Sequence, residues 1–347
     1  MRLGFFRRGA RPPLALICKY INSHKEDYRV EPICRAPRSA GVKIAPSTFY
    51  AHTTRPPSAC TLRDEKLTEE IITVHQANYD AYGARKMHVV INRDDPHQRG
   101  HVARCTIERL MRAAGLHGIV RAKAPNTTRS APREKCPADL VNRHFASYWP
   151  NRLWVADITY VRTFSGWVYV AFVTDVFSQM IVGWQCSRSL YTGLAKDALT
   201  MGIYQRRREG WNNLSGLVHH SDRGVQYRAF RYGEALDDEQ AVASVGSKGD
   251  PYDNALAEAV NSLYKAELIR NRGPWTGIDD VEAATSEWVH WFNTTRPHSS
   301  IEYKSPAEFE EAYPHGRAPD TPVVDGADSP VPHTGPRART RTVPRAA

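Results

Sequence analysis

The residues from 151 to about 312 hold the densest apolar segments of the chain, and the order of these segments limits the folds they can adopt. Short apolar runs bounded by turns indicate strands, and longer runs with apolar residues three and four positions apart indicate helices. We expect strands at 153–161, 167–174, 180–186, 217–221 and 241–245, and helices at 190–208, 229–238 and 252–269. Hairpins first and helical crossovers later predict an α/β fold, with a mixed five-stranded sheet between flanking helices.

The other regions differ in composition. Residues 1–60 are basic and interrupted by prolines, and residues 61–120 show helical periodicity. Residues 121–150 form a basic segment rich in Thr and Pro, which indicates a linker before the core at 151–312. Residues 313–347 are rich in Pro and Arg with few large apolar side chains, so we expect a disordered tail.

Positive charge gathers in the first part of the chain. The chain has 47 Lys and Arg against 37 Asp and Glu, a net charge of +10. Residues 1–150 carry a net charge of +13 and residues 151–347 carry −3. A basic front part on a near-neutral remainder suggests a module that binds a polyanion such as nucleic acid, although a solvated basic surface gives the same count.

The cysteines and the apolar runs exclude several classes of protein. The six cysteines lie far apart and form no C-x-x-C pair, which argues against a structural zinc site or a disulfide framework. No run approaches the roughly 20 apolar residues of a membrane helix, and the first residues lack the apolar stretch of a secretory signal. We therefore expect free thiols and a cytoplasmic location.

Three helices are expected within residues 61–120, at 64–79, 84–92 and 105–114. Two short helices joined by a turn suit a helix-turn-helix laid on DNA, although a helical bundle with solvated basic faces fits the same pattern. The residues that would contact DNA are Arg85, Lys86, Arg104, Arg109 and Arg112.

Three acidic residues stand out in the core. Asp157 lies in the middle of an apolar strand, where a charge is costly unless it is paired or binds a metal. Asp222 follows the fourth strand, at the end where open α/β sheets bind ligands, and Glu258 lies on the last helix. Each of the three has an ordinary structural explanation when taken alone. Their spacing is more specific, because 35 residues separate Asp222 from Glu258 and Lys265 follows seven positions later.

In this pattern the chain resembles the D,D-35-E transposases and retroviral integrases. It is most similar to the OrfB proteins of bacterial insertion sequences with two overlapping reading frames. The resemblance rests on four ordered stretches, at 154–160, 219–227, 250–265 and 291–298, and extends over residues 30–313. It implies a ribonuclease-H-like core preceded by a helix-turn-helix-like DNA-binding region.

The resemblance also implies a reaction and a cofactor. Family members use the two aspartates and the glutamate to hold Mg²⁺, with Mn²⁺ as a substitute, and three oxygen ligands suit either ion. Two ions would serve phosphoryl transfer, with Asp157 bridging both while Asp222 and Glu258 each hold one. Water would attack first, at an end of the element, and the freed 3′-hydroxyl would then attack a second phosphodiester. Lys265 would contact the DNA terminus.

The resemblance leaves other residues and partners to be tested. Four further residues are candidates to lie beside the metal ligands and orient them: His219, His220, Asn254 and Asp175. The partners expected are double-stranded DNA, further copies of the chain to hold two DNA ends, and an upstream-frame OrfA protein. One departure lies in the outermost helix-turn-helix, whose first helix, near 33–38, would contain Pro37.

Two other functions fit much of the same pattern. One is a DNA-binding or regulatory protein that descends from a transposase and has lost catalysis, which the presence of all three acids disfavours. The other is a nuclease on the same fold, which the basic front region and the pairing of Glu258 with Lys265 disfavour.

Overall fold

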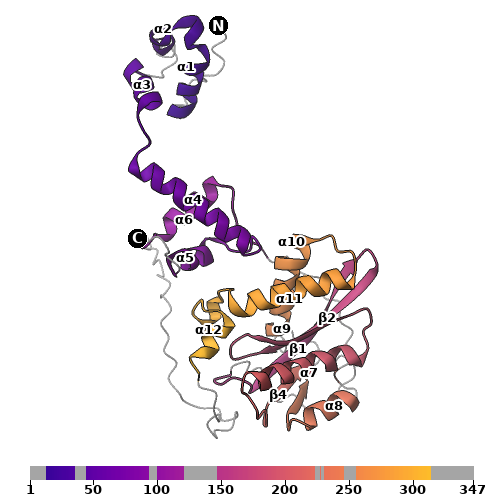
Figure 1. The fold of residues 1–347 in the computed structure, drawn as a ribbon. Coiled ribbons are helices and arrows are strands. Elements are labelled where there is room, and N and C mark those ends of the chain that lie inside the picture. The colour runs from indigo at the N-terminus through magenta and orange to yellow at the C-terminus, as the bar shows by residue number, and fades with distance from the viewer. Residues whose placement is uncertain are drawn as a thin grey trace, which may run out of the picture. The chain divides into compact units, whose positions relative to one another are not determined.

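The computed structural model describes residues 13–35, 44–93, 100–120, 147–222, 227, 230–245 and 255–313 (Figure 1). The chain divides into two compact units, and each is considered by itself. Unit 1 contains Met1–Ala124 and Leu263–Gly273, and unit 2 contains Pro125–Ser262 and Pro274–Ala347. Among the described helices, none combines the length and the apolar character that crossing a membrane requires.

Unit 2 is built on a five-stranded sheet in the order β3-β2-β1-β4-β5. Its strands are β1 Leu153–Thr163, β2 Gly166–Asp175, β3 Ile181–Ser187, β4 Val218–Ser221 and β5 Val242–Val245. The first three strands pair antiparallel, and β1, β4 and β5 pair parallel. The mixed five-stranded sheet expected from the order of apolar segments is therefore confirmed, with strand ends moved by one or two residues.

One face of this sheet is covered by α7 (Thr192–Arg208) and α8 (Phe230–Asp237) (Figure 1). Trp154 and Ala156 of β1 are buried there with Leu194 of α7 and Tyr232 of α8. Helix α7 lies unusually close to β3, because a Cβ atom on Gly183 would come 2.1 Å from the carbonyl oxygen of Ala198. A side chain at this glycine would push the helix off the sheet.

The opposite face carries α9 (Ala255–Tyr264) and α11 (Ile278–Thr294) (Figure 1). Leu153 and Val155 of β1 are buried against Ala257 of α9, and the ring of Phe172 lies 6.1 Å from that of Trp288 on α11. Because side chains alternate along a strand, Asp157 shares this second face with Leu153 and Val155.

Two further short helices complete unit 2. The 3₁₀ turn η5 covers Ser299–Ile301, and α12 covers Pro306–Glu311. Helix α12 begins with a capping box, in which the Ser305 hydroxyl accepts from the Glu308 backbone N–H and the Glu308 carboxylate accepts from the Ser305 N–H.

Unit 1 contains the helices that the basic front region predicts. Helices α4 Ala59–Ala77, α5 Ala84–Arg93 and α6 Arg104–Ala113 lie where the three helices were expected, with ends moved by up to five residues. The side chains of Leu67, Met87 and Ile107, one from each helix, are buried. The Asn92 amide fixes the link between α5 and α6, since its nitrogen donates to the Val102 carbonyl at 3.1 Å and its oxygen accepts from the Val102 N–H at 2.7 Å.

The outermost helices form a second small core. Helices α1 Leu14–Tyr28, α2 Val30–Arg35 and α3 Pro46–Thr54 bury apolar residues that include Ile21, Ile33 and Phe49. Helix α2 is described up to Arg35, so the interruption expected at Pro37 is not tested. Pro37 itself lies outside the described residues.

The last helix of the core also differs from the expectation. A single α-helix was expected over 252–269, but α9 ends at Tyr264 and the chain continues as a π-helical turn, η4, over Lys265–Ile269. Helix α10, Arg270–Arg272, follows directly. Most of the expected linker, and the tail after Tyr313, lie outside the described residues.

Candidate functional site

The two aspartates are brought together by the parallel pairing of β1 with β4. In this register Ala156 lies opposite Ser221, so Asp157 and Asp222 are the next residues along the two neighbouring strands. Neighbouring strands lie about 4.8 Å apart, and residues in register place their side chains on the same face. The two aspartates are near enough for the charge of Asp222 to raise the pKa of Asp157.

Helix α9 places a third group beside them. Ala257 packs on the β1 face near Val155, and Asn261 lies one helical turn later, about 6 Å further along the axis. Asp157 lies two strand residues after Val155, a step of about 6.6 Å. The two steps are nearly equal in length, so Asn261 comes level with Asp157. The Asn261 amide nitrogen donates to Oδ2 of Asp157 at 2.8 Å. This bond fixes the helix that carries Glu258 to the strand that carries Asp157.

The pKa of Asp157 is raised to about 7. Burial is the largest cause, and the negative charge of Asp222 raises the pKa further, with a smaller rise from Glu258. The backbone N–H of Ile158, which donates to Oδ1 at 2.8 Å, and the Asn261 amide act in the opposite direction because they stabilise the ionised form. The charges of both Asp222 and Glu258 therefore raise the pKa of Asp157.

Glu258 and Tyr227 complete the surroundings of the two aspartates. Partial burial raises the pKa of Glu258, although its side chain is exposed. The Tyr227 hydroxyl is buried and has no hydrogen-bond partner among the described residues. Burial, the neighbouring Tyr232 and the charges of Asp157 and Asp222 all raise the pKa of Tyr227, which keeps its hydroxyl protonated near the acids.

The two histidines before Asp222 lie on opposite faces of the sheet. His219 is in register with Trp154, away from Asp157, and its Nε2 lies 3.0 Å from the Tyr232 hydroxyl. Burial and the neighbouring His220 lower the pKa of His219 to about 3, so this ring is neutral and packs in the core. His220 lies on the Asp157 face, where its Nδ1 is 2.9 Å from the hydroxyl of Ser244.

Asp175 does not belong to the site, which corrects the expectation for this residue. It is in register with Trp154 and so points to the face opposite Asp157. Its carboxylate accepts from the guanidinium of Arg206 at 3.1 Å and from the backbone N–H groups of Asn151 and Phe177. Asn254 lies outside the described residues.

Asn261 and Tyr227 are the site residues that sequence reasoning missed. Asn261 lies three residues after Glu258 on α9, and it is only 8% exposed and donates to Asp157. Its distance of four residues from apolar Ala257 was a signal that both lie on the inner face. Tyr227 carried no such signal, because its proximity to the acids depends on the fold.

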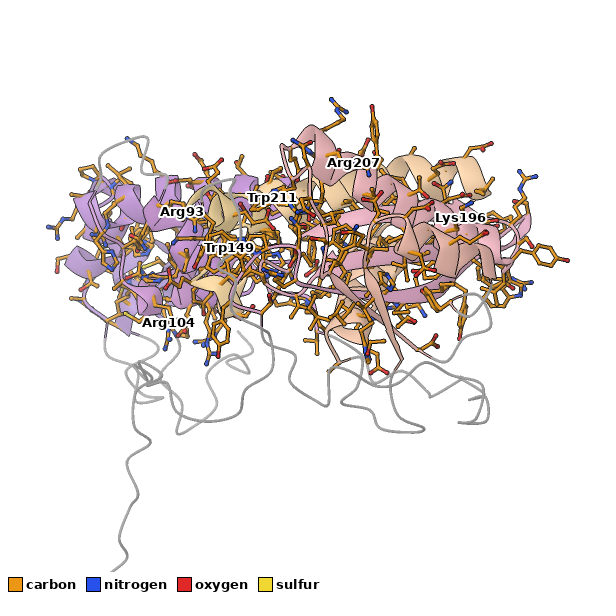
Figure 2. The ribbon with its side chains drawn as sticks, turned by 90° about the horizontal axis from the view of Figure 1, so that it is seen from below. Arg93, Arg104, Trp149, Lys196, Arg207 and Trp211 are labelled. Carbon is orange, nitrogen blue, oxygen red and sulfur yellow. The ribbon has the colours of Figure 1, made fainter. Side chains whose placement is uncertain are left out.

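The basic residues expected to contact DNA lie on α5 and α6 of unit 1, and Figure 2 marks Arg93 and Arg104 on these helices. Arg85 and Arg112 are exposed, whereas Lys86 is half-buried with its ammonium 5.6 Å from the centre of the Tyr82 ring. Two of the expected arginines form ion pairs within the unit, Arg104 with Glu108 at 3.0 Å and Arg109 with Asp64 at 2.8 Å. Exposed pairs of this kind are weak, so their DNA contacts stay predictions.

The chemistry of the three acids fits a hard divalent cation. All three donors are carboxylates that repel one another, and a cation among them would relieve the repulsion that raises the pKa of Asp157. Among the described residues, no three His, Cys, Asp or Glu side chains are already spaced as ligands of a single ion.

Comparisons with known proteins match both units. Residues 148–251 and 241–306 match two models of an integrase core domain, and residues 62–124 match an HTH-like domain. A Mycobacterium tuberculosis protein named for the transposase of insertion sequence element IS986/IS6110 is 48% identical over 270 residues, which cover 78% of this chain and 96% of that protein. The chain belongs to the insertion-sequence transposases. The expected resemblance and function are thereby confirmed.

Other relatives of this transposase are named in the same way. The transposase of insertion sequence element IS629 from Shigella sonnei is 42% identical over 294 residues, 83% of this chain and 94% of that one. The solved magnesium complex of the HTLV-2 integrase catalytic core domain is 15% identical, with a TM-score of 0.37, over 47% of this chain and 99% of that one. A simian T-cell lymphotropic virus intasome structure is 14% identical, with a TM-score of 0.43, over 74% and 80%.

Removing the Asn261 amide tests its bond to Asp157 in this transposase. In Asn261→Ala, the ionised form of Asp157 loses a donor, so its pKa rises above 7 and DNA strand cleavage at pH 7 falls about tenfold. The loss is expected to shrink towards pH 9, where Asp157 is ionised in either case. The measurement is a pH profile of cleavage, with Ser262→Ala on the same helix as the control. A loss that is equal at every pH would contradict the role assigned to the amide.

Proposed function

We propose that this transposase cuts DNA at the ends of its insertion element and joins the freed 3′ ends to a target, with Asp157, Asp222 and Glu258 as the catalytic acids. The observation that supports the proposal is that Asp157 and Asp222 each follow the last paired residues of β1 and β4, Ala156 and Ser221, and that Asn261 on the Glu258 helix donates to Asp157 at 2.8 Å. Both reactions are in-line displacements at phosphorus, in which an oxygen attacks and a phosphorus–oxygen bond breaks.

The three carboxylates are the residues that would hold Mg²⁺, or Mn²⁺ in its place, and we expect two ions. Bound there, the ions would supply Lewis-acid stabilisation of the attacking and leaving oxygens. Asp157 would lose its proton as it becomes a ligand, because its pKa of about 7 leaves it partly protonated at neutral pH. Asn261 keeps one oxygen of Asp157 in place through its 2.8 Å hydrogen bond.

The substrates follow from the two units together. The HTH-like domain would bind the duplex near the element end, with Arg85, Lys86, Arg104, Arg109 and Arg112 on phosphates or base edges. Lys265 would contact the terminus. Two ends have to be held at once for joining, so we expect an assembly of two or more copies, and an upstream-frame OrfA protein as a further partner.

The deciding experiment uses duplex DNA that carries the ends of the element and a supercoiled target. With Mg²⁺ or Mn²⁺, the full-length protein is expected to give both nicked ends and products joined to the target, and with EDTA neither. Nicked ends without joined products would favour a nuclease. Binding to the ends without any cleavage, at several pH values and with both ions, would favour a regulatory derivative.

The raised pKa of Asp157 predicts how stability depends on pH without divalent ions. The folded pKa of about 7 lies above the ordinary value of 3.8, so the folded state is penalised for ionising Asp157. The penalty is absent below about pH 4, grows between pH 4 and 7, and is constant above. In EDTA, Asp157→Asn is therefore expected to be more stable than wild type by about 2 kcal/mol at pH 8 and equally stable at pH 4.

Urea unfolding at pH 4 and pH 8 measures this difference. Asp197→Asn, which changes an exposed aspartate on α7, is the matched control and is expected to show no such dependence on pH. Added Mg²⁺ should stabilise wild type at pH 8 and leave Asp157→Asn nearly unchanged. Wild type as stable as Asp157→Asn at pH 8 in EDTA would contradict the electrostatic description of the site.

A further inference from the structure

The hairpin of β1 and β2 in unit 2 extends well beyond the neighbouring strand β4. Strand β4 ends at Ser221, opposite Ala156, whereas β1 runs on to Thr163, about 23 Å further along the strand. Beyond Asp157, no described strand pairs with β1 on its β4 side. This part of the hairpin therefore has an open edge.

The tip of the hairpin is anchored to the segment that precedes α11. The backbone N–H groups of Phe164 and Ser165 donate to the carbonyl oxygens of Trp275 and Thr276, at 2.9 and 3.2 Å. The Ser165 hydroxyl donates to the same oxygen of Thr276 at 2.8 Å. On the face of the hairpin that Asp157 shares, the side chain of Val161 is buried. The extension is thus held in place and covered on this face.

The opposite face of the extension carries exposed aromatic rings. Tyr160 pairs with Tyr169 across the two strands, and Arg162 pairs with Trp167, so all four side chains lie on one face. The centre of the Trp167 ring lies 5.3 Å from that of Tyr160 and 5.1 Å from the guanidinium carbon of Arg162. Even with these contacts, 45% of Trp167 is exposed.

Further exposed rings lie at the same end of the sheet. Phe164, in the turn between β1 and β2, is 79% exposed. Strand β3 ends at Ser187, opposite Tyr169, so the residues that follow it leave the sheet at this end. Among them, Tyr191 is 80% exposed. We call the group of Tyr160, Arg162, Phe164, Trp167 and Tyr169 the hairpin surface.

The charges around the hairpin surface favour an anionic partner. From residue 158 to residue 174 the hairpin contains one cation, Arg162, and no acidic residue. Arg188 adds a second, exposed cation after β3, and Lys196 and Asp197 at the start of α7 offset each other. A second copy of the chain docked here about a twofold axis would bring the same cations together, which is unfavourable.

The balance of rings and charges distinguishes between two forms of DNA. Duplex DNA presents mainly phosphates on its outside and hides the flat faces of its bases, so it is held mostly by charged and polar groups. Unpaired bases expose those faces, and aromatic side chains next to cations bind them by stacking, whatever the base. The hairpin surface offers more ring than charge, so it suits a strand with unpaired bases.

We propose that the hairpin surface stacks unpaired bases next to the cut, on the DNA strand whose phosphodiester lies at Asp157. Tyr160 follows Asp157 by three residues, about 10 Å along the same strand. DNA held at Asp157 reaches the rings by passing over the open edge of β1. Trp167 and Phe164 stack on bases, and Arg162 and Arg188 contact phosphates. This stacking offsets part of the cost of unpairing the bases beside the cut.

This inference rests on the proposed function, because it takes Asp157 as the place where DNA is cut. Its test uses full-length variants in EDTA, so that binding is measured without cleavage. Trp167→Ala and Phe164→Ala each remove a ring, and Trp167→Phe keeps an aromatic face. Tyr204→Ala is the matched control, because it removes an exposed ring on α7 that lies 5.9 Å from the guanidinium carbon of Arg208. Phe164 is the more exposed ring, so Phe164→Ala tests the proposal even where Trp167→Ala fails to fold.

Fluorescence anisotropy compares a short single-stranded DNA of mixed sequence with the duplex of the same sequence. Trp167→Ala and Phe164→Ala are expected to bind the single strand about five- to tenfold more weakly than wild type, and the duplex equally well. Trp167→Phe should recover most of the loss. Tyr204→Ala should bind both DNAs like wild type.

Photocrosslinking locates the bound bases and distinguishes their source. Iodouracil is placed either beside the cleavage position of the element end or in the target DNA. Trypsin releases residues 163–188 as one peptide, because no Lys or Arg lies between Arg162 and Arg188. Crosslinks to Phe164 or Trp167 are expected from bases beside the cleavage position.

Four results would overturn the proposal. These are wild-type binding of the single strand in both ring variants, an equal loss in Tyr204→Ala, an equal loss for the duplex, or crosslinks to this peptide from target bases alone. Self-association of wild type that Trp167→Ala abolishes, with binding of the single strand unchanged, would assign the surface to a second copy instead.

Glu258→Gln, run alongside, separates this inference from the proposed function. If Glu258→Gln is inactive while the ring variants bind the single strand like wild type, only the hairpin surface fails. If Glu258→Gln cleaves and joins normally, the catalytic assignment fails, and binding and crosslinking in EDTA still decide whether the surface holds unpaired bases.

Discussion

Replacing a carboxylate of the site by its amide is expected to lower strand cleavage and joining by at least about 100-fold, in Asp157→Asn, Asp222→Asn and Glu258→Gln alike. An amide has nearly the same size as the carboxylate, so packing against α9 and β4 is preserved. It carries no negative charge, so it holds a divalent cation more weakly and cannot neutralise one. The largest loss is expected for Asp157, because its neighbours in the site include both other acids.

The measurement is the yield of nicked and joined DNA with Mg²⁺ at neutral pH. DNA binding in EDTA should persist in all three variants, since the basic residues of unit 1 are unchanged. Asp197→Asn on the exposed side of α7 is the control for the removal of an acid elsewhere. If the glutamine variant at position 258 joins DNA at the wild-type rate, the site has been assigned to the wrong residues.

Arg206→Met is expected to destabilise the protein by about 3–5 kcal/mol. The Arg206 guanidinium is fully buried and binds both oxygens of Glu310, at 2.6 and 2.7 Å, as well as Asp175 at 3.1 Å. Ser178 also donates to Glu310, so the network ties α7, β2 and α12 together. Without the cation, two carboxylates would remain in the interior with no positive charge to offset the cost of burial.

The neighbouring arginine provides the control. Arg207, marked in Figure 2, forms an ion pair with Glu239 on the surface, with half of its side chain exposed, so Arg207→Met should cost less than about 1 kcal/mol. Urea unfolding in EDTA at pH 7 compares the two variants with wild type. Equal midpoints for Arg206→Met and Arg207→Met would show that the buried network does not hold α12 in place.

The same network explains why Asp175 misled the sequence analysis. It follows a strand, as a metal-binding acid of this fold does, and its pKa is raised to about 6 by burial, against the opposing effect of Arg206. Its partner Arg206 is 31 residues away in the sequence, and Glu310, which binds the same arginine, is 104 residues from Arg206. Local pattern carries no information about such pairings. Only the sheet register shows that it points away from Asp157.

The bounds of some helices could be predicted from the sequence, and those of others could not. The apolar period predicted a helix over 84–92, and α5 covers Ala84–Arg93, because its buried face depends on local spacing alone. The same apolar period predicted one continuous α-helix over residues 252–269. The π-helical turn departs from it at Lys265, within residues 263–273, which group with residues 1–124 that lie far away in the sequence.

By itself, the sequence determined the family and the mixed sheet and predicted the three acids, since residue type, order and spacing along the chain are local quantities. The tertiary structure decided which side chains join those acids. Strand register placed Asp157 beside Asp222 and turned Asp175 away, and the seating of Ala257 on β1 turned Asn261 inward. Packing between elements that are distant in the sequence sets the strand register and the rotation of each helix about its axis. A shift by one residue in either of them changes which groups a side chain contacts.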